Sequence, residues 1–562
     1  RARRRGFRVA WGSAWEEGGA PAFWPWVQVI RGCVQSDDPR IVGPIADFVP
    51  ELRPRAPGVE AGADPSSSPG PDAERERFQL FDTVTTVLKS AAERQPLVLV
   101  FDDLHAAASP ALLLLLFLSR ELRDARILVI GTYRDGEAAR IPPVARALAR
   151  IGRHAERLEL SGLGEQEVAS LIEQTTRRRP AAALATAIHV ATDGNPFFVD
   201  AILRVLDSGG ALPDGDAPGA LRLPREVYET VRQRFEPFSE DVRRVLTVAA
   251  VIGREFDLAQ LEPTCDLDRD RLQELLREAL AAGVIRETTR TPARYAFVHG
   301  LLRETLYDDL PAGMRRALHR SVGEALEGLY ADDLDAHAAE LARHFLHAAT
   351  CETVEPGVVR KAIDHLRRAG ERAQALLAFE EAALHYEQAL SLLKPSADPR
   401  EVASVLLALA TAQGRAGDMS RARETFQLAA SHARAARDTE LLARAALGFG
   451  ATADIDGFEA VGHVDTDHVA LLEEALAVQP PDALSTRARL LGRLSLALYW
   501  SDADQRREAL GRDAMDLAER TGDPAILAAT LSSLCFATWR PDNLEERLAT
   551  ATRLLGAAGE AR

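Results

Sequence analysis

The chain has 562 residues, too many for one hydrophobic core, so we expect several domains. Hydrophobic residues make up 46% and charged residues 27% of it, an ordinary composition for a soluble globular protein. Acidic side chains outnumber basic ones 84 to 68, and the formal net charge is -16. This balance argues against a general nucleic-acid surface, because binding to phosphates needs a basic excess.

Apolar runs and cysteines point to a cytoplasmic protein without a membrane span. The longest apolar run, Ala111–Leu118, is far shorter than the roughly 20 residues that cross a bilayer. The cysteines lie far apart, and no pair has the spacing of zinc ligands, so we expect reduced thiols at these four positions: Cys33, Cys265, Cys351 and Cys535.

Residues 1–155 are predicted to form an α/β domain. Phe7–Trp11 is a short candidate strand, and Leu97–Phe101 and Arg126–Tyr133 are continuous apolar runs typical of strands buried on both faces. Phe78–Arg94, between the first two strands, has the periodicity of an amphipathic helix. Strands that alternate with helices indicate a parallel sheet with helices on both faces.

After residue 155 the strand signal fades, and residues 156–235 are predicted to be a small helical domain. Two short helices, Glu165–Thr176 and Ala181–Thr192, lead into Gly194-Asn195-Pro196, which indicates the end of one helix and the start of the next. The polar Gly/Asp/Pro-rich stretch Ser208–Pro218 is a plausible boundary.

Residues 236–330 have the element order of a winged helix. Three helical segments precede Val284–Thr288 and Arg294–Val298, which are predicted to pair as the wing. Residues 236–300 contain 12 acidic residues against 9 arginines, so this domain is not expected to bind DNA.

Residues 331–562 are alanine-rich helix, and two segments of them share a repeat. Ala382, Tyr386 and Ala389 recur 40 residues later as Ala422, Phe426 and Ala429. Small-large-small at steps of four and three suits the second helix of a tetratricopeptide (TPR) hairpin, where alanines admit the neighbouring helix and the aromatic ring fills the groove. Ordinary helix-pair packing without a true repeat is the alternative.

Two motifs carry candidate chemistry. Leu97–His105 reads LVLVFDDLH, a buried strand that ends in two acids. In a P-loop NTPase such acids hold Mg²⁺ through water (here Asp102) and orient or deprotonate the attacking water (here Asp103). Arg134, in Gly131–Asp135 (GTYRD), ends the next strand, where it can read a γ-phosphate at the same sheet edge. The alternative for Asp102 and Asp103 is that they are two solvated acids at a strand end, and the alternative for Arg134 is a surface salt bridge.

Five segments in order resemble the ATPase module of large ATP-binding bacterial regulators of the STAND class of P-loop ATPases, including LuxR-type and cyclase-associated proteins. The segments are WGSAWEEGGAPAFWPWVQVIRG (11–32), FDDLHAAASPALLLLLFLSREL (101–122), GTYRD (131–135), TDGNPFFVDAIL (192–203) and YAFVHGLLRETLYDDLPAGMRRALHRSVGEALE (295–327). The resemblance covers nearly the whole chain. It implies a truncated P-loop NTPase core, a helical lid, a winged helix and a TPR-like solenoid.

The resemblance also implies ligands and roles. ATP or ADP with Mg²⁺ is the expected nucleotide, Pro196 would pack near the adenine, and His299 would contact the β-phosphate in the closed, ADP-bound state. A protein or small-molecule inducer would bind the C-terminal repeats, and ATP would promote self-association. A structural helix start at Pro196 and a structural role for His299 are the alternatives.

The sequence departs from this family in two places. No GxxxxGK[ST] phosphate-binding loop occurs in the 562 residues, and Ala106–Ala108 stands where family members usually have Trp-Ala-Asp. Because the chain opens with Arg1 in a basic stretch, we expect it to be a fragment cut after its P-loop. Two hypotheses remain: a nucleotide-dependent signalling ATPase with slow hydrolysis, and a non-hydrolysing TPR-type interaction scaffold.

Overall fold

The computed structural model divides into two compact units, residues 1–154, 338–342 and 360–562 in the first and residues 155–337 and 343–359 in the second. It describes residues 2–14, 23–33, 72–177, 180, 182–192, 194–196, 198–200, 202–203, 235, 237–288, 293–298, 300–350, 355–394, 397–450, 463–538 and 543–561. The predicted boundary at Ser208–Pro218 lies outside the described residues. Within them no helix is both long and apolar enough to cross a membrane.

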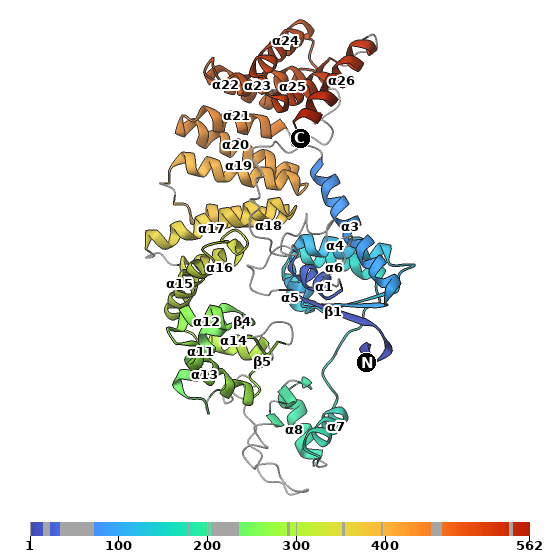
Figure 1. Cartoon of the computed structure of the whole chain (residues 1–562), viewed down its shortest axis with the longest axis vertical. Coiled ribbons are helices and arrows are strands. Elements are labelled where there is room, and N and C mark those ends of the chain that lie inside the picture. The colour runs from blue at the N-terminus through green and yellow to red at the C-terminus, as the bar shows by residue number, and fades with distance from the viewer. Residues whose placement is uncertain are drawn as a thin grey trace. The chain divides into compact units, whose positions relative to one another are not determined.

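The first sheet lies near the start of the chain and is parallel, as predicted (Figure 1). Its described strands are β1 (Arg8–Ser13), β2 (Leu97–Asp102) and β3 (Ile127–Gly131), in the order β1-β2-β3. The central strand β2 is buried from Leu97 to Phe101, which explains its continuous apolar run.

Helices pack on the face of this sheet that carries Phe101. Trp26 packs on Phe101 of β2 with ring centroids 4.7 Å apart, and its indole N–H donates to the carbonyl of Ala111 at 2.9 Å. These contacts join the sheet to α1 and α4. The helices of this domain are α1 (Trp24–Cys33), α3 (Asp72–Arg94), α4 (Ser109–Glu121), α5 (Asp135–Arg140) and α6 (Pro142–Ile151), with single 3₁₀ turns at Arg3–Arg5, Leu104–Ala106 and Gly152–His154.

The opposite face of the sheet is only partly covered. The register places Trp11, Val100 and Ile130 in one row across the three strands. Val100 in the centre is 6% exposed, whereas Trp11 is 50% and Ile130 43% exposed. Leu128, two residues before Ile130 on β3, is 54% exposed. Strand β3 therefore has the sequence of a buried strand but carries exposed aliphatic side chains.

In the second unit, α7 (Glu165–Thr176) and α8 (Ala182–Thr192) pack around a small apolar core of their own. This confirms the two short helices predicted there. The core includes Val168 and Ile172 of α7 and Ile188 of α8, all essentially inaccessible to solvent.

A second sheet, antiparallel and three-stranded, occupies the same unit with the order β4-β6-β5. β5 (Ile285–Glu287) pairs with β6 (Arg294–Phe297), which confirms the predicted pairing, and β4 (Glu255–Asp257) lies on the other side of β6. Assignment to the winged-helix fold stays a prediction. The accompanying helices are α11 (Glu240–Ile252), α12 (Leu258–Cys265), α13 (Arg269–Ala281), α14 (Gly300–Asp308), α15 (Ala312–Leu329) and α16 (Ala338–Ala348), of which residues 343–348 belong to this unit.

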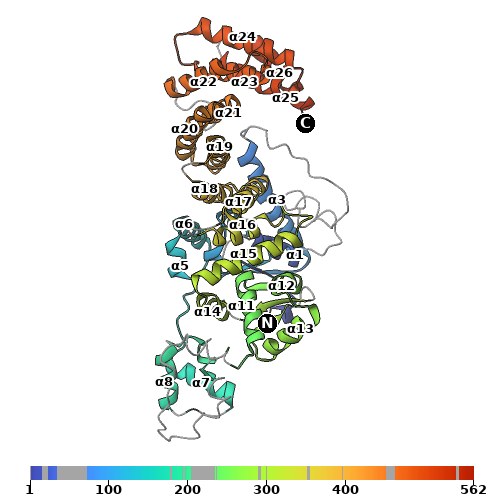
Figure 2. The ribbon, with the colours of Figure 1, turned by 90° about the vertical axis from the view of Figure 1, so that its left-hand side faces the viewer.

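The C-terminal part is a series of helices, each packed on the next, as Figure 2 shows. The predicted repeat positions all lie in its core: Ala382, Tyr386 and Ala389 on α18, and Ala422, Phe426 and Ala429 on α20, are at most 3% exposed. The helices are α17 (Pro356–Ala375), α18 (Phe379–Leu392), α19 (Pro399–Arg415), α20 (Met419–Ala436), α21 (Thr439–Gly450), α22 (Thr466–Val478), α23 (Leu484–Ala497), α24 (Asp504–Thr521), α25 (Pro524–Ala537) and α26 (Leu544–Glu560).

Glycines let the two aromatic side chains of the repeat approach their neighbours. A Cβ atom on Gly370 of α17 would lie 2.6 Å from the Tyr386 ring, and one on Gly448 of α21 would lie 2.3 Å from the Phe426 ring. Each aromatic side chain therefore packs directly against the backbone of an adjacent helix. This close approach is the physical basis of the helical repeat arm.

Candidate functional site

The candidate site lies at the carboxyl edge of the parallel sheet, where the three strands end level with one another. Asp102 is the last residue of β2 and is paired in register with Ser13, the last residue of β1. The backbone N–H of Ala14 donates to the carbonyl of Asp102 at 2.9 Å, and that of Thr132 donates to Phe101 at 2.9 Å. Asp102, Asp103 and Arg134 thus follow neighbouring parallel strands at one edge, where open α/β sheets bind ligands.

The hydroxyl of Thr132 connects the two acids. It donates to Oδ1 of Asp102 at 2.5 Å and accepts the backbone N–H of Asp103 at 3.1 Å. One oxygen of Asp102 is thereby held in place across the strands, while its other oxygen takes no part in this bond. The arrangement orients the carboxylate.

Asp103 leaves the strand in a sharp turn. Its φ of 59° lies in the left-handed region, which aspartate tolerates better than most residues. A 3₁₀ turn, Leu104–Ala106, follows at once, and Leu104 N–H donates to the carbonyl of Thr132 at 2.8 Å. Gly131 permits this packing, because a Cβ there would lie 2.5 Å from Cδ1 of Leu104.

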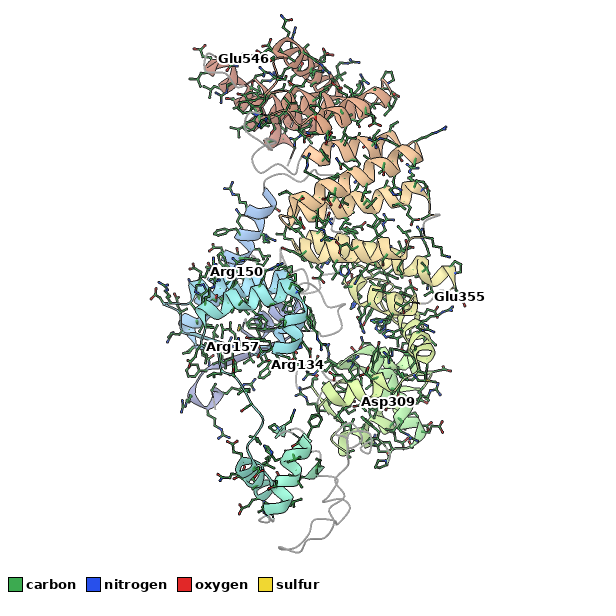
Figure 3. All side chains as sticks on the ribbon, turned by 180° about the vertical axis from the view of Figure 1, so that it is seen from behind. Arg134, Arg150, Arg157, Asp309, Glu355 and Glu546 are labelled. Carbon is green, nitrogen blue, oxygen red and sulfur yellow. The ribbon has the colours of Figure 1, made fainter. Side chains whose placement is uncertain are left out.

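Arg134, which is labelled in Figure 3, immediately precedes α5. Its side chain is held by Glu137 on the first turn of that helix. Its Nη1 lies 2.8 Å from Oε1 of Glu137, and the other oxygen, Oε2, lies 3.0 Å from Nε2 of the buried His105. The backbone N–H of Arg134 donates to Nδ1 of His105 at 3.4 Å. Glu137 therefore joins the arginine to the acidic turn through His105, and the ion pair that the sequence left open as an alternative for Arg134 is present.

The oxygen donors at this edge suit magnesium better than a softer metal. Mg²⁺ keeps several waters and binds through one or two carboxylates together with substrate phosphates. Asp102, with one oxygen oriented by Thr132, fits the role of a single carboxylate acting through water. Among the described residues no group of three or more His, Cys, Asp or Glu side chains has the geometry of a metal site built by protein alone.

No protein-family model matches the chain. One curated relative, an uncharacterized protein of Rhizobium meliloti (strain 1021), is 24% identical over 366 residues. The match covers 63% of this chain and 33% of the relative, so the matched part spans about a third of that protein's length.

Solved structures give coarse likenesses. A Signal Transduction ATPase with Numerous Domains (STAND) protein with a tetratricopeptide repeat sensor, from Pyrococcus horikoshii, is 13% identical, with 86% of this chain and 71% of that chain covered and a TM-score of 0.34. Aspartyl phosphate phosphatase F from Bacillus subtilis is 15% identical, with 61% of this chain and 87% of that chain covered and a TM-score of 0.30. RuvB from Thermotoga maritima is 18% identical, with 42% of this chain and 84% of that chain covered and a TM-score of 0.18.

The remaining predicted site residues lie in the second unit. Gly194, with φ of 68°, ends α8, and Leu163 N–H donates to its carbonyl at 2.8 Å. Asn195 then accepts the N–H of Val199 at 3.0 Å, and the exposed Pro196 is the first residue of the next helical turn. The predicted helix stop and start is confirmed, whereas contact of Pro196 with adenine stays a prediction. His299 lies outside the described residues.

Three side chains of this site had no role assigned from the sequence: Thr132, His105 and Glu137. Thr132 and His105 lie within the quoted motifs, directly after the strand in one case and two residues after the acid pair in the other. A polar residue at a parallel strand end was the available signal. Glu137 carried no comparable signal, because a glutamate on the first turn of a helix is common at any surface.

Proposed function

We propose that this chain belongs to a nucleotide-dependent signalling ATPase, in which the carboxyl edge of the parallel sheet binds Mg²⁺ and ATP phosphates and the helical repeat arm senses a partner. The observation that carries the proposal is the placement of Asp102, Asp103 and Arg134 at one sheet edge, with Thr132 orienting the first acid. Asp102 would hold Mg²⁺ through water, and Asp103 would act on the attacking water.

Arg134 would supply the response to the γ-phosphate. In the present structure its guanidinium is paired with Glu137 at 2.8 Å, in a largely exposed position. A phosphate at the sheet edge offers a stronger, charge-assisted partner than a surface carboxylate. Exchange of Glu137 for phosphate would free the oxygen of Glu137 that contacts Arg134, while its other oxygen contacts His105.

The exposed side chains of β3 support a phosphate loop on an additional strand–loop–helix unit. A fourth parallel strand on the edge of β3 where no described strand pairs, and a helix over Trp11, Leu128 and Ile130, would cover the exposed part of the sheet. In a parallel α/β sheet the loop between such a strand and its helix lies at the carboxyl edge. It would therefore lie at the same edge of the sheet as Arg134 and Asp102, where a glycine-rich loop can bind phosphates.

The repeat arm would receive the signal. Its helices pack in series, as in repeat proteins that bind partners on extended surfaces. A protein or small-molecule inducer on the arm, and self-association in the ATP state, complete the proposed switch. We propose a cytoplasmic location, and an output domain such as a DNA-binding or cyclase domain would belong to another part of the protein.

The test is ATP hydrolysis by the protein translated from its complete reading frame. Asp103→Asn should lower the turnover rate about 10²- to 10⁴-fold, the usual contribution of a general base, and leave ATP binding nearly unchanged. Asp124→Asn, an exposed acid in the loop before β3, is the matched control and should keep normal turnover. Full activity of the Asp103→Asn variant would refute the assigned role.

The second candidate is a scaffold that binds partners without hydrolysing ATP. The observation that favours it is that the GxxxxGK[ST] pattern does not occur in residues 1–562. Isothermal titration of residues 1–562 should detect at most very weak ATP binding under either proposal. A complete reading frame that also fails to bind ATP would favour the scaffold, and micromolar binding by residues 1–562 alone would contradict our account of the missing loop.

A further inference from the structure

Four helices of the second unit meet at a buried cluster of histidine and arginine side chains, separate from the sheet edge. His319 on α15 and His344 on α16 are both fully buried, and their Nδ1 atoms lie 3.0 Å apart. The two helices approach closely there, because a Cβ on Gly323 would lie 3.3 Å from Cβ of His344. Two imidazoles in contact and out of reach of water must share protons in a defined way.

The hydrogen bonds determine the tautomer of each ring. Arg343 can only donate, and its Nη2 lies 2.9 Å from Nε2 of His344, so this nitrogen is an unprotonated acceptor. His344 then carries its proton on Nδ1 and donates to Nδ1 of His319. His319 in turn carries its proton on Nε2, 2.9 Å from the hydroxyl oxygen of Tyr307 on α14, which accepts it. The bonds run in one direction, from Arg343 through both rings to Tyr307.

Arginines attach the same cluster to the end of α11. Nη2 of Arg343 also donates to the carbonyl of Ile252 at 2.7 Å, and Nε of Arg303 on α14 donates to the carbonyl of Ala250 at 2.8 Å. The chain of bonds therefore joins α11, α14, α15 and α16. With both rings neutral, each ring nitrogen has a partner of the correct type.

A proton added to either ring breaks this chain. Protonated His344 would direct an N–H at the guanidinium of Arg343, and protonated His319 would direct one at the N–H of His344. The charged and titratable groups around the rings also oppose protonation, because each carries or can gain a positive charge. They are Arg303 on α14, Arg315 on α15, and Arg343 and His347 on α16. His347 stacks on His319 with ring centroids 4.5 Å apart.

We propose that Arg343, His344, His319 and Tyr307 form an acid-sensitive latch that holds α16 against α11, α14 and α15 only while both imidazoles are neutral. The latch responds to protons through residues other than those of the sheet edge. It acts on the helix that precedes α17 and the repeat arm.

The sign of the pH response follows from the buried rings. Burial, followed by the charges of His347 and Arg343, lowers the pKa of His319 to about 2, and burial lowers the pKa of His344 well below its usual value of 6.5. In the opened state both rings regain a pKa near 6.5. Protons therefore bind the opened state as the pH falls below about 6.5, and the closed state is lost in that direction. Below pH 6.5, each ring raises the equilibrium constant for opening about tenfold per pH unit, and the two rings together raise it about 100-fold per pH unit.

Hydrogen exchange with mass spectrometry on residues 1–562, corrected for the intrinsic pH dependence of exchange, tests the latch. Between pH 7.5 and pH 5.5 the opening equilibrium of α15 and α16 should rise by about 10- to 100-fold, while α19 and α20 in the repeat arm stay protected. The double variant His319→Gln/His344→Gln keeps a donor and an acceptor at each position but cannot titrate, and its α15 and α16 should show no pH response. His154→Gln, at an exposed histidine, is the matched control and should respond like the unmodified chain.

Equal protection of α15 and α16 at both pH values in the unmodified chain would overturn the proposal, whether or not the double variant folds. An unchanged pH response in a folded double variant would do the same. So would an equal loss of protection in α19 and α20, because it would mean general unfolding in acid.

Discussion

Replacement of Thr132 by valine isolates the contact that organises the candidate site. Valine has nearly the shape of threonine but lacks the hydroxyl, which donates to Asp102 at 2.5 Å and accepts from Asp103 at 3.1 Å. Both hydrogen bonds disappear in Thr132→Val, and a methyl group faces the carboxylate instead. Thr132→Ser keeps the hydroxyl and serves as the control.

The expected effect follows from the two bonds. A hydrogen bond to a charged group contributes about 1.5–3 kcal/mol and one between neutral groups about 0.5–1.5 kcal/mol. Both bonds lie at an exposed edge where water can replace the lost partner, so the lower values apply and their sum is about 2 kcal/mol. At 25 °C this corresponds to roughly a 30-fold increase in local opening of the turn after β2.

Hydrogen exchange of peptides that span Phe101 to His105 measures this opening directly in residues 1–562. Thr132→Val should expose the amides of Asp103 and Leu104 about 30-fold more often, and Thr132→Ser should stay within about threefold of the unmodified chain. Exchange in Thr132→Val that stays within threefold would refute the reasoning. Thr132→Ser that exchanges as fast as Thr132→Val would also contradict it, because serine keeps the hydroxyl.

Two further predictions concern packing. Phe426→Ala should lower the free energy of unfolding of the repeat arm by about 3–5 kcal/mol, because Phe426 is only 3% exposed. Leu428→Ala on the same helix should change it by less than about 0.5 kcal/mol, because Leu428 is 54% exposed. Urea denaturation followed by the helical circular dichroism signal checks this, and equal losses in the two variants would contradict it. Gly131→Ala should destabilise the sheet domain by about 1–3 kcal/mol, because the Cβ of the alanine would lie 2.5 Å from Cδ1 of Leu104. In thermal unfolding, the double variant Gly131→Ala/Leu104→Ala should recover part of that loss. Strictly additive losses would show that the two side chains do not compete for space.

Periodicity and short motifs were sufficient to predict much of the architecture. The apolar run Leu97–Phe101 predicts a central strand because a strand buried on both faces has no polar side to show, and β2 has that burial. Ala422, Phe426 and Ala429 predict a close helix pair because small and aromatic side chains at this spacing fit one groove, and all three are buried on α20. The common edge of Asp102 and Arg134 follows from parallel strand direction alone.

The partners of these residues were decided by the tertiary structure. Thr132, after β3, reaches Asp102 at the end of the neighbouring β2. Glu137 pairs with both Arg134, three residues before it, and His105, which follows β2. His319 and His344 are 25 residues apart on different helices, and only the packing of α15 on α16 brings their rings together. Local sequence determines which face of an element is apolar, because periodicity is a property of the element itself. Which polar groups meet depends on how the elements pack, since a hydrogen bond requires a separation of about 3 Å that no sequence pattern specifies.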